Sequence, residues 1–349
     1  TYRSIGPAYP LRTCARSKAI GKPAGQYQAC EVTETACRDG KSLQGTREKG
    51  EKKAMSKIMT QEERFKKMVE TPVSRLIPSL AVPTIISMLI TSIYNMADTY
   101  FVSQINTSAS AAVGVSYSLM SMIQAFGFTL GMGGGNYLSR VLGTRDTEKA
   151  ERIASTAFYS AIAVGAVLAV AGLLFLDPLV KILGATDTIA PYAKDYAKYI
   201  LMAAPIMTGA LSMNNLLRFQ GLAVYAMVGI TLGGVLNMIL DPILIFGFDM
   251  GIAGAAIATA FSQLVSFLIL FAQSNLRKDC VHLNPKKITF RGWMYGEILH
   301  GGIPSLCRQG VASIATAALN LAANPFGDAA IAAMSIVSRY MMFINSALI

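Results

Sequence analysis

The sequence of 349 residues is poor in charged side chains, and this excludes most classes of soluble protein. Only 15% of the residues are Asp, Glu, Lys or Arg, whereas 53% are hydrophobic, and the mean hydropathy is +0.44. A soluble domain of this length cannot bury so much apolar surface. The composition therefore predicts an integral membrane protein.

Residues that build common catalytic and metal sites are also scarce. The two histidines, His282 and His300, have no partner at the spacing of a metal site, and the five cysteines show neither metal-like spacing nor a disulfide framework. The glycine run GMGGG at 131–135 lacks the spacing and the preceding strand of a dinucleotide loop, and is typical of close helix approach. We therefore expect no enzyme, no catalytic residue and no cofactor.

Acidic residues are few, 20 against 31 Lys and Arg, but the excess is unevenly distributed. Residues 1–54 hold eleven basic and five acidic residues, and most other basic residues lie between apolar segments. This distribution favours membrane orientation, so no nucleic-acid partner is expected. Residues 1–54 are predicted to be a disordered tail or a mis-assigned upstream translation. Residues 55–75 are predicted to form an amphipathic helix at the membrane surface.

Long apolar segments occupy the rest of the chain, and most exceed the roughly 20 residues that a membrane span requires. Lys and Arg fall in alternate connections, which by the positive-inside rule predicts a cytoplasmic amino terminus. Arg140, Arg145 and Arg218 are then orientation charges or, alternatively, gating partners of a carboxylate. The eight segments are 76–105, 108–142, 150–176, 189–217, 223–247, 250–276, 295–323 and 328–349.

An internal repeat appears when the sequence is shifted by 221 positions. Pro83 then falls on Pro304, and the turn after the first segment falls on the turn after the seventh. An even number of spans separates the two units, so they share one orientation. We therefore predict a six-helix unit followed by the first two helices of a second one, in a fragment of a twelve-span protein.

Ionisable groups inside the apolar segments are the strongest functional candidates, because a carboxylate in hydrocarbon needs a partner, a proton or water. Asp98 lies in the first span, Asn237 and Asp241 share a helix face in the fifth, and Thr259 lies in the sixth. Counted from the turns, these residues lie at a similar depth in the outer half of the membrane. Their oxygens suit a small hard cation such as Na⁺, or a shared proton. The alternative is that neighbouring hydroxyls satisfy the carboxylates within tight packing.

Four motifs together resemble multidrug and toxic compound extrusion (MATE) transporters, in particular their MepA/DinF-like bacterial branch. They are YNMADTYFV at 94–102, GMGGGNYLSRVLG at 131–143, NNLLRFQG at 214–221 and NMILDP at 237–242. The resemblance implies an all-α polytopic membrane protein of two six-helix lobes around a central cavity. It also implies export of cationic amphipathic drugs and dyes, driven by entry of Na⁺ or H⁺. The family's cation or proton site carries over onto Asp98, Asn237, Asp241 and Thr259.

The domain organisation that follows has a first lobe at 76–277, a cytoplasmic loop at 278–292 and a partial second lobe at 293–349. We expect a monomeric multi-pass protein in the lipid bilayer of the bacterial inner membrane. Two alternatives remain open. One is a related lipid-linked oligosaccharide flippase, which should show a strongly cationic cavity; the other is a non-transporting scaffold or membrane-embedded enzyme.

Polar residues elsewhere in the spans are candidates for the substrate cavity. Gln124, Asn214 and Asn215 either bind a ligand or hold helices together. Arg308 and Arg339 lie in the seventh and eighth spans, at positions equivalent by the repeat to serines. Each arginine either lines the cavity or pairs with a structural partner.

Overall fold

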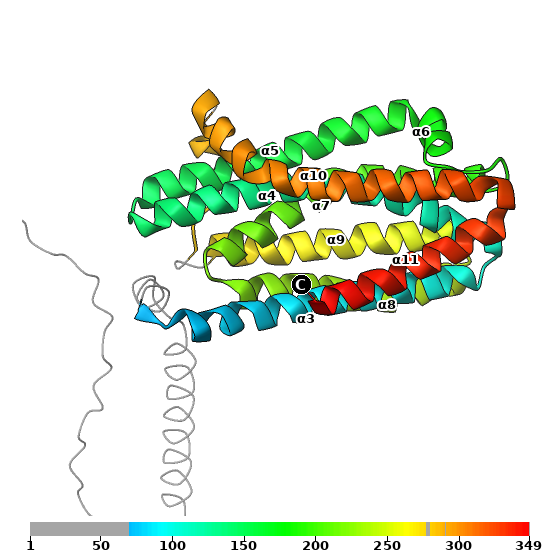
Figure 1. Ribbon diagram of the computed structural model, residues 1–349, viewed down its shortest axis with the longest axis horizontal. Coiled ribbons are helices and arrows are strands. Elements are labelled where there is room, and N and C mark those ends of the chain that lie inside the picture. Colours follow the sequence, from blue (N-terminus) through cyan, green and yellow to red (C-terminus); the bar gives the residue numbers. More distant parts are fainter. Residues whose placement is uncertain (1–69, 277–279, 290, 349) are drawn as a thin grey trace, which may run out of the picture. The chain divides into compact units, whose positions relative to one another are not determined.

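The computed structural model describes residues 70–276, 280–289 and 291–348. These residues contain nine α-helices, which belong to one compact unit (Figure 1). The predicted extension at 1–54 and the surface helix as far as residue 69 lie outside the described residues. The all-α architecture predicted from the sequence is confirmed for the described part of the chain.

Eight long helices occupy the eight predicted apolar segments, with ends close to those expected. An additional short helix, α6 (Leu176–Ile182), lies in the connection after the third span and was not predicted. The long helices are α3 (Val73–Ser103), α4 (Thr107–Gly143), α5 (Thr147–Leu174), α7 (Ala190–Phe219), α8 (Ala223–Pro242), α9 (Gly251–Leu276), α10 (Gly292–Ala323) and α11 (Asp328–Leu348).

Six of these helices, α3, α4, α5, α7, α8 and α9, are long and apolar enough to cross a membrane, with α8 counted together with the following turn to Gly247. Helices α10 and α11 have 32 and 21 residues and carry Arg308 and Arg339 within them. They are not among the six. The two helices nevertheless pack along the six, as expected for the start of a second lobe.

Polar side chains define where the helices begin. Asn106 caps α4, because its Oδ1 accepts a hydrogen bond from the backbone N–H of Ala109 at 2.6 Å. Asp146 caps α5 in the same way, accepting from the N–H of Lys149 at 3.0 Å. Such caps satisfy backbone donors that have no partner within the helix. The turns predicted near residues 105 and 145 therefore have a local physical cause.

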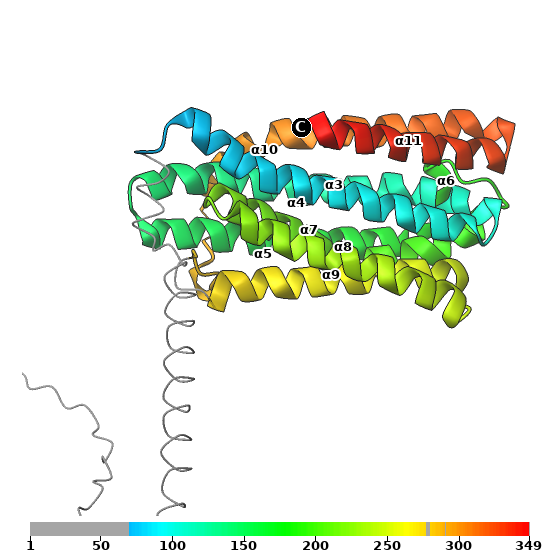
Figure 2. The ribbon, with the colours of Figure 1, turned by 90° about the horizontal axis from the view of Figure 1, so that it is seen from below.

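Helices α4 and α7 form the centre of the bundle. Of the most apolar stretch of each helix, 72% is buried for α4 and 78% for α7, whereas the value for α3 is only 11%. Helix α4 packs most extensively on α10 and α7, and α11 packs on α4 and α3. Helices α10 and α11 thus lie along α3 and α4, on the side away from α9 (Figure 2).

The glycine run in α4 allows the close helix approach predicted from the sequence. A Cβ at Gly131 would lie 2.8 Å from Ser212 Cα in α7, and one at Gly134 would lie 2.5 Å from Ala157 Cβ in α5. A Cβ at Gly133 would lie 1.9 Å from a backbone oxygen of α10. Real Cβ atoms cannot approach other atoms so closely, so only glycine permits α4 to contact three helices at this level.

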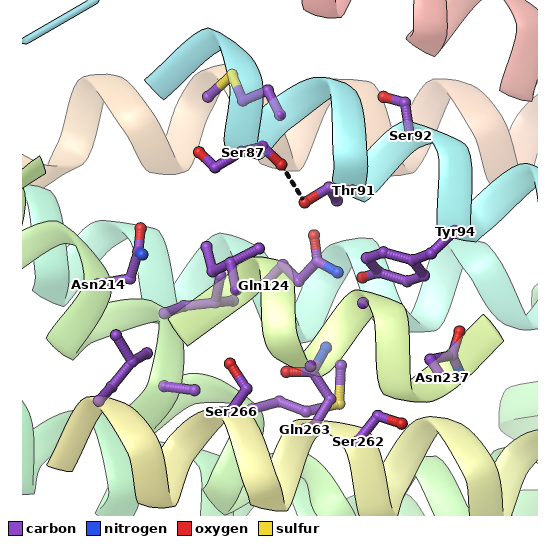
Figure 3. A pocket seen from close by; sticks show the side chains of 18 of the residues that line it. Ser87, Thr91, Ser92, Tyr94, Gln124, Asn214, Asn237, Ser262, Gln263 and Ser266 are labelled. Carbon is purple, nitrogen blue, oxygen red and sulfur yellow. Dashed lines mark hydrogen bonds between the residues drawn. The ribbon is translucent and has the colours of Figure 1, made fainter. Parts of the chain in front are cut away.

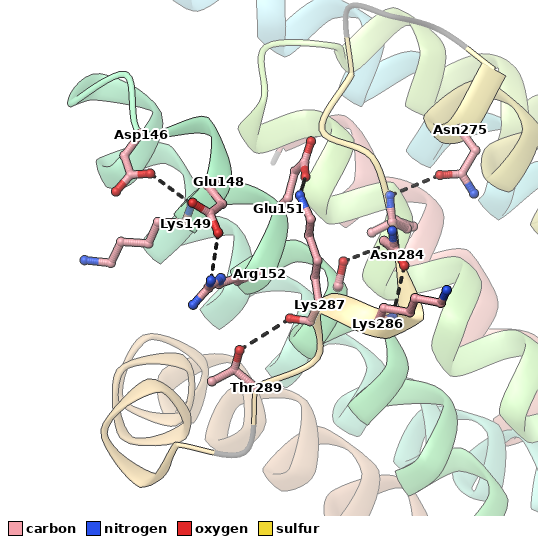
Figure 4. Close-up of polar contacts among 12 residues, drawn as sticks. Asp146, Glu148, Lys149, Glu151, Arg152, Asn275, Asn284, Lys286, Lys287 and Thr289 are labelled. Carbon is pink, nitrogen blue, oxygen red and sulfur yellow. Dashed lines mark hydrogen bonds and ion pairs between the residues drawn. The ribbon is translucent and has the colours of Figure 1, made fainter.

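One end of the bundle carries the basic connections. There the segment 280–289 is attached to α5 (Figure 4). The backbone N–H of Asn284 donates to Ser155 Oγ at 3.0 Å, and that of Thr289 donates to Thr156 Oγ1 at 3.1 Å. Lys287 forms an ion pair with Glu151 of α5. The segment therefore packs as a structured strap on the end of α5. We call this end of the bundle the basic end.

At the opposite end, Asp328, the first residue of α11, joins α11 to α4 and to the connection between α6 and α7. Its carboxylate accepts hydrogen bonds from Ser108 Oγ at 2.7 Å, from Thr186 Oγ1 at 2.9 Å and from Thr188 Oγ1 at 2.8 Å. Three hydroxyl donors from two separate elements thus converge on one acidic residue. Charge-assisted hydrogen bonds of this kind are stronger than neutral ones.

The helix bounds agree with the 221-residue repeat. Helix α4 begins at Thr107 and α11 begins at Asp328, 221 positions later. Under this repeat, α3 corresponds to α10 and α4 corresponds to α11. The contact between α3 and α11 therefore has an equivalent in the contact between α10 and α4, and both contacts are present.

Candidate functional site

The four residues predicted to bind a cation or proton come from three helices and are all buried. Asp98 on α3 is 4% exposed, Asn237 and Asp241 on α8 are 2% and 0% exposed, and Thr259 on α9 is 5% exposed. All four lie toward the end of the bundle opposite the basic end, as the turns at 104–106 and 248–250 require.

Asn237 links these residues through its amide. Its Nδ2 donates to Asp241 Oδ1 at 3.2 Å and to Thr259 Oγ1 at 3.3 Å, which connects α8 to α9. Asp98 lies near enough for its charge to act on Asp241. The structure thus brings together the residues that the sequence placed at one depth. Their role in binding remains a prediction.

Three oxygen atoms of this cluster are buried without a hydrogen-bond donor: Asp98 Oδ1, Asn237 Oδ1 and Asp241 Oδ2. Buried oxygens without donors are unfavourable unless a cation or an added proton satisfies them. Carboxylate and amide oxygens are hard ligands, which fit Na⁺ or H⁺ better than a soft transition metal.

Helix α8 changes its geometry directly after Asp241. Pro242 has no N–H, so it cannot donate to the carbonyl of Met238 one turn before it. The chain continues from Pro242 as a π-helix, η1 (Ile243–Gly247). π-Helical turns are rare and frequently lie at functional sites. The carbonyl of Met238, one turn before Pro242, therefore lacks the donor that a regular α-helix would give it.

Tyr196 on α7 belongs to the same cluster, although the sequence analysis did not select it. Its side chain is 1% exposed, it lies close enough to Asp98, Asp241 and Thr259 for electrostatic interaction, and its hydroxyl approaches Met120 Sδ at 4.0 Å. Tyr196 lies six residues after the start of α7, inside the predicted segment 189–217 and close to the turn that precedes it. Its distance from that turn, which sets its depth along the bundle, was the one feature of the sequence that could have indicated a place in the site.

An internal cavity of about 180 Å³ lies next to the cluster, between α3, α4, α7, α8 and α9 (Figure 3). Asn237 lines one end of it and Asn214 the other, with Tyr94, Gln124 and Gln263 between them (Figure 3). Apolar side chains form much of the remaining wall, including Met342 of α11; the others are Met88, Phe128, Met207, Leu211, Ile230 and Leu270. The candidate cation site and the cavity therefore share Asn237.

The five predicted cavity residues divide into two groups. Gln124 and Asn214 line the cavity, although the Asn214 amide also donates to the carbonyl of Ala226 at 3.0 Å. The other three do not line this cavity. The amide of Asn215 donates within its own helix at 2.9 Å, Arg308 is exposed on α10, and Arg339 is buried against α3.

Arg218 lines the cavity at the side toward the basic end. Its Nη2 donates to Ser87 Oγ at 3.0 Å, so it bridges α7 and α3 rather than extending into solvent. The sequence analysis considered it as an orientation charge or as a gating partner of a carboxylate. Its observed partner is a neutral hydroxyl. Arg218 is also the only charged residue among those that line the cavity.

Comparison with known proteins gives consistent results. The MatE family model matches residues 83–243. The chain is 30% identical over 275 residues to "Multidrug export protein MepA" of Staphylococcus aureus (strain MRSA252), covering 78% of this chain and 61% of the relative. The chain thus spans about three fifths of the length of the curated relatives it matches.

Solved structures of similar proteins extend the likeness to the fold. One is the MATE multidrug transporter DinF-BH in complex with R6G, with a TM-score of 0.74 and 30% identity over 78% of this chain and 62% of that one. Another is an inward-facing multidrug resistance MATE family transporter, with a TM-score of 0.69 and 30% identity over 76% of this chain and 61% of that one. Together with the six apolar helices, these findings show a multi-pass membrane protein whose residues 83–243 match the MatE family model and whose fold is similar to that of MATE transporters.

Proposed function

We propose that this chain forms the first lobe and the first two second-lobe helices of a secondary active exporter of cationic amphipathic drugs or dyes. Entry of Na⁺ or H⁺ at Asp98, Asn237, Asp241 and Thr259 drives the export by alternating access. The observation that carries the proposal is the set of three buried oxygens without donors beside a cavity. The names of the relatives, a multidrug export protein and a transporter in complex with R6G, support the substrate class.

The size of the cavity bears on how a substrate binds. Sites for drug-sized molecules usually measure about 300–1,000 Å³, whereas this cavity measures about 180 Å³. A drug therefore requires a state in which the surrounding helices separate. Helix α11 contributes Met342 to the wall, so its movement relative to α3 and α4 would widen the cavity.

The charge of the cavity discriminates between an exporter and a flippase of lipid-linked oligosaccharides. A flippase for that anionic ligand calls for a strongly cationic cavity, but Arg218 is the only charged residue that lines this one. Two acidic residues lie beyond its other end. A single arginine does not make the cavity strongly cationic, so the arrangement argues against the flippase. We further propose that the basic end faces the cytoplasm of a bacterial cell. The candidate site then lies toward the outer leaflet of the inner membrane. The protein acts there as a monomer.

The substitution Asp241→Asn tests the proposal, because it removes one charge and nearly preserves shape. Expressed as part of the complete exporter in a bacterium that lacks its own drug exporters, the wild-type sequence should lower dye accumulation, and Asp241→Asn should abolish that effect at equal amounts in the membrane. Asp249→Asn is the matched control, because Asp249 lies in an exposed turn at φ 54°, a conformation that Asn also adopts. Dye export that persists in Asp241→Asn would refute the assigned site.

A further inference from the structure

Arg339 on α11 is a buried cation without an acidic partner. Its side chain is 6% exposed, and no carboxylate in the described part of the chain lies within ion-pairing distance. Its Nη1 donates to the backbone oxygen of Asn95 at 2.9 Å and approaches Asn95 Oδ1 at 3.4 Å. The guanidinium carbon lies 5.4 Å from the centre of the Tyr117 ring. Only neutral groups therefore contact a charge that is costly to bury.

This charge lies one helical turn from the candidate cation site. Asn95 and Asp98 are three residues apart on α3, so they share a helix face and are separated by about 4.5 Å along the axis. The charge of Arg339 acts on Asp98. The titratable groups near the guanidinium come from three helices: Tyr94 and Asp98 on α3, Tyr117 on α4, and Tyr196 on α7. Asp241 on α8 lies beyond Asp98, whose charge acts on it.

The contact between α3 and α11 does not need a charge to hold the helices together. By the 221-residue repeat, Arg339 corresponds to Ser118 on α4. At that equivalent contact, Asn320 of α10 approaches Ser118 Oγ at 3.5 Å and the carbonyl oxygen of Gly114 at 3.5 Å. Neutral residues suffice at this level of the contact between α10 and α4, whereas the ion pair of Arg140 with Glu297 lies at the exposed basic end of the two helices. The arginine where α11 meets α3 therefore has another role.

We propose that Arg339 is a fixed internal cation that competes with the mobile cation for the carboxylates of Asp98 and Asp241. Two ionised carboxylates and one guanidinium leave a net charge of −1, which a single monovalent cation neutralises. Binding of that cation repels Arg339 and weakens the attachment of α11 to α3. Because such coupling is reciprocal, withdrawal of α11 in turn strengthens cation binding. The inference rests on the cation site of the proposed function.

Sodium binding to the purified chain tests this competition. Calorimetric titration with NaCl, at constant ionic strength in choline chloride, compares the wild type with Arg339→Gln, Arg339→Lys and Arg291→Gln. Removing a unit charge this close to the site should tighten sodium binding roughly tenfold or more. Arg339→Lys should retain the wild-type affinity. Arg291→Gln should also match the wild type, because it removes an equal charge in the basic-end connection, where Arg291 precedes α10.

The outcomes distinguish a failure of the inference from a failure of the proposed function on which it rests. Sodium affinity that is unchanged or weaker in Arg339→Gln overturns the competition, and loss of binding in Asp241→Asn would then still uphold the site. An absence of sodium binding in the wild type and in Arg339→Gln overturns the inference and the sodium form of the proposed function together.

A second measurement needs no variant and applies if Arg339→Gln does not fold. Hydrogen exchange of the wild-type chain is compared with and without sodium, because weaker attachment exposes backbone amides to exchange. Amides of α11 should exchange faster in sodium, and those of α5, which is remote from the contact, should not change. Slower or unchanged exchange in α11 overturns the inference.

Discussion

The contact between α4 and α10 gives the sharpest test of how the two lobes meet. A Cβ at Gly302 would lie 2.2 Å from the carbonyl oxygen of Thr129 and 2.9 Å from Thr129 Cγ2. The nearest obstacle is backbone, which cannot rotate away as a side chain can. Non-bonded heavy atoms need about 3.5 Å, so Gly302→Ala would force the helices apart by roughly 1 Å.

The expected cost of this substitution follows from two opposing terms. Overpacking of this kind costs about 1–3 kcal/mol. Replacing glycine by alanine within a helix stabilises it by about 0.5–1 kcal/mol. Gly302→Ala should therefore lower the free energy of unfolding by about 1–2 kcal/mol. Gly310→Ala on the same helix should raise it, because no neighbouring atom lies within 4 Å of the added Cβ.

Unfolding of the purified chain in mixed detergent micelles, followed by fluorescence, measures both changes. The chain has one tryptophan, Trp293, and its ring packs edge-on against Tyr137 of α4. The fluorescence therefore reports directly on the contact between α10 and α4. The two variants should shift the unfolding midpoint in opposite directions. An equal gain in stability for both would refute the close approach of these helices.

Two further substitutions test the candidate site and the opposite end of the bundle. Tyr196→Phe removes a hydroxyl that lies near Thr259 and the two aspartates but keeps the buried ring, so sodium binding should weaken about fivefold for one lost polar interaction; unchanged calorimetric affinity would exclude that hydroxyl from the site. Asp328→Ala leaves the hydroxyls of Ser108, Thr186 and Thr188 without their acceptor and should destabilise the chain by about 1–3 kcal/mol. Chemical unfolding at the wild-type midpoint would contradict that role of Asp328.

The helices themselves could be predicted from the sequence because their causes are local. Apolar segments of sufficient length, separated by polar turns, define where a chain can cross a bilayer. The cap at Asn106 and the glycine run at 131–135 also lie within single segments. The short helix α6 was missed because it has only seven residues and lies within a connection.

The candidate site could be predicted in part, for a related reason. Asp98 and Asp241 stand out because an acidic residue within an apolar segment is expensive wherever the segment packs. Tyr196 could not be recognised in this way, because a buried tyrosine carries no comparable cost. Its place in the site depends on the face that α7 turns toward α8 and α9.

The sequence by itself determined which segments cross the membrane, where they turn, and which polar groups need a partner within it. Only the tertiary structure decided which partner each group has. Arg308 and Arg339 look alike as arginines inside predicted spans, yet one is exposed on α10 and the other is buried one turn from Asp98. The difference arises because hydrophobic length defines a span, whereas the rotation of each helix about its axis is set by packing against its neighbours.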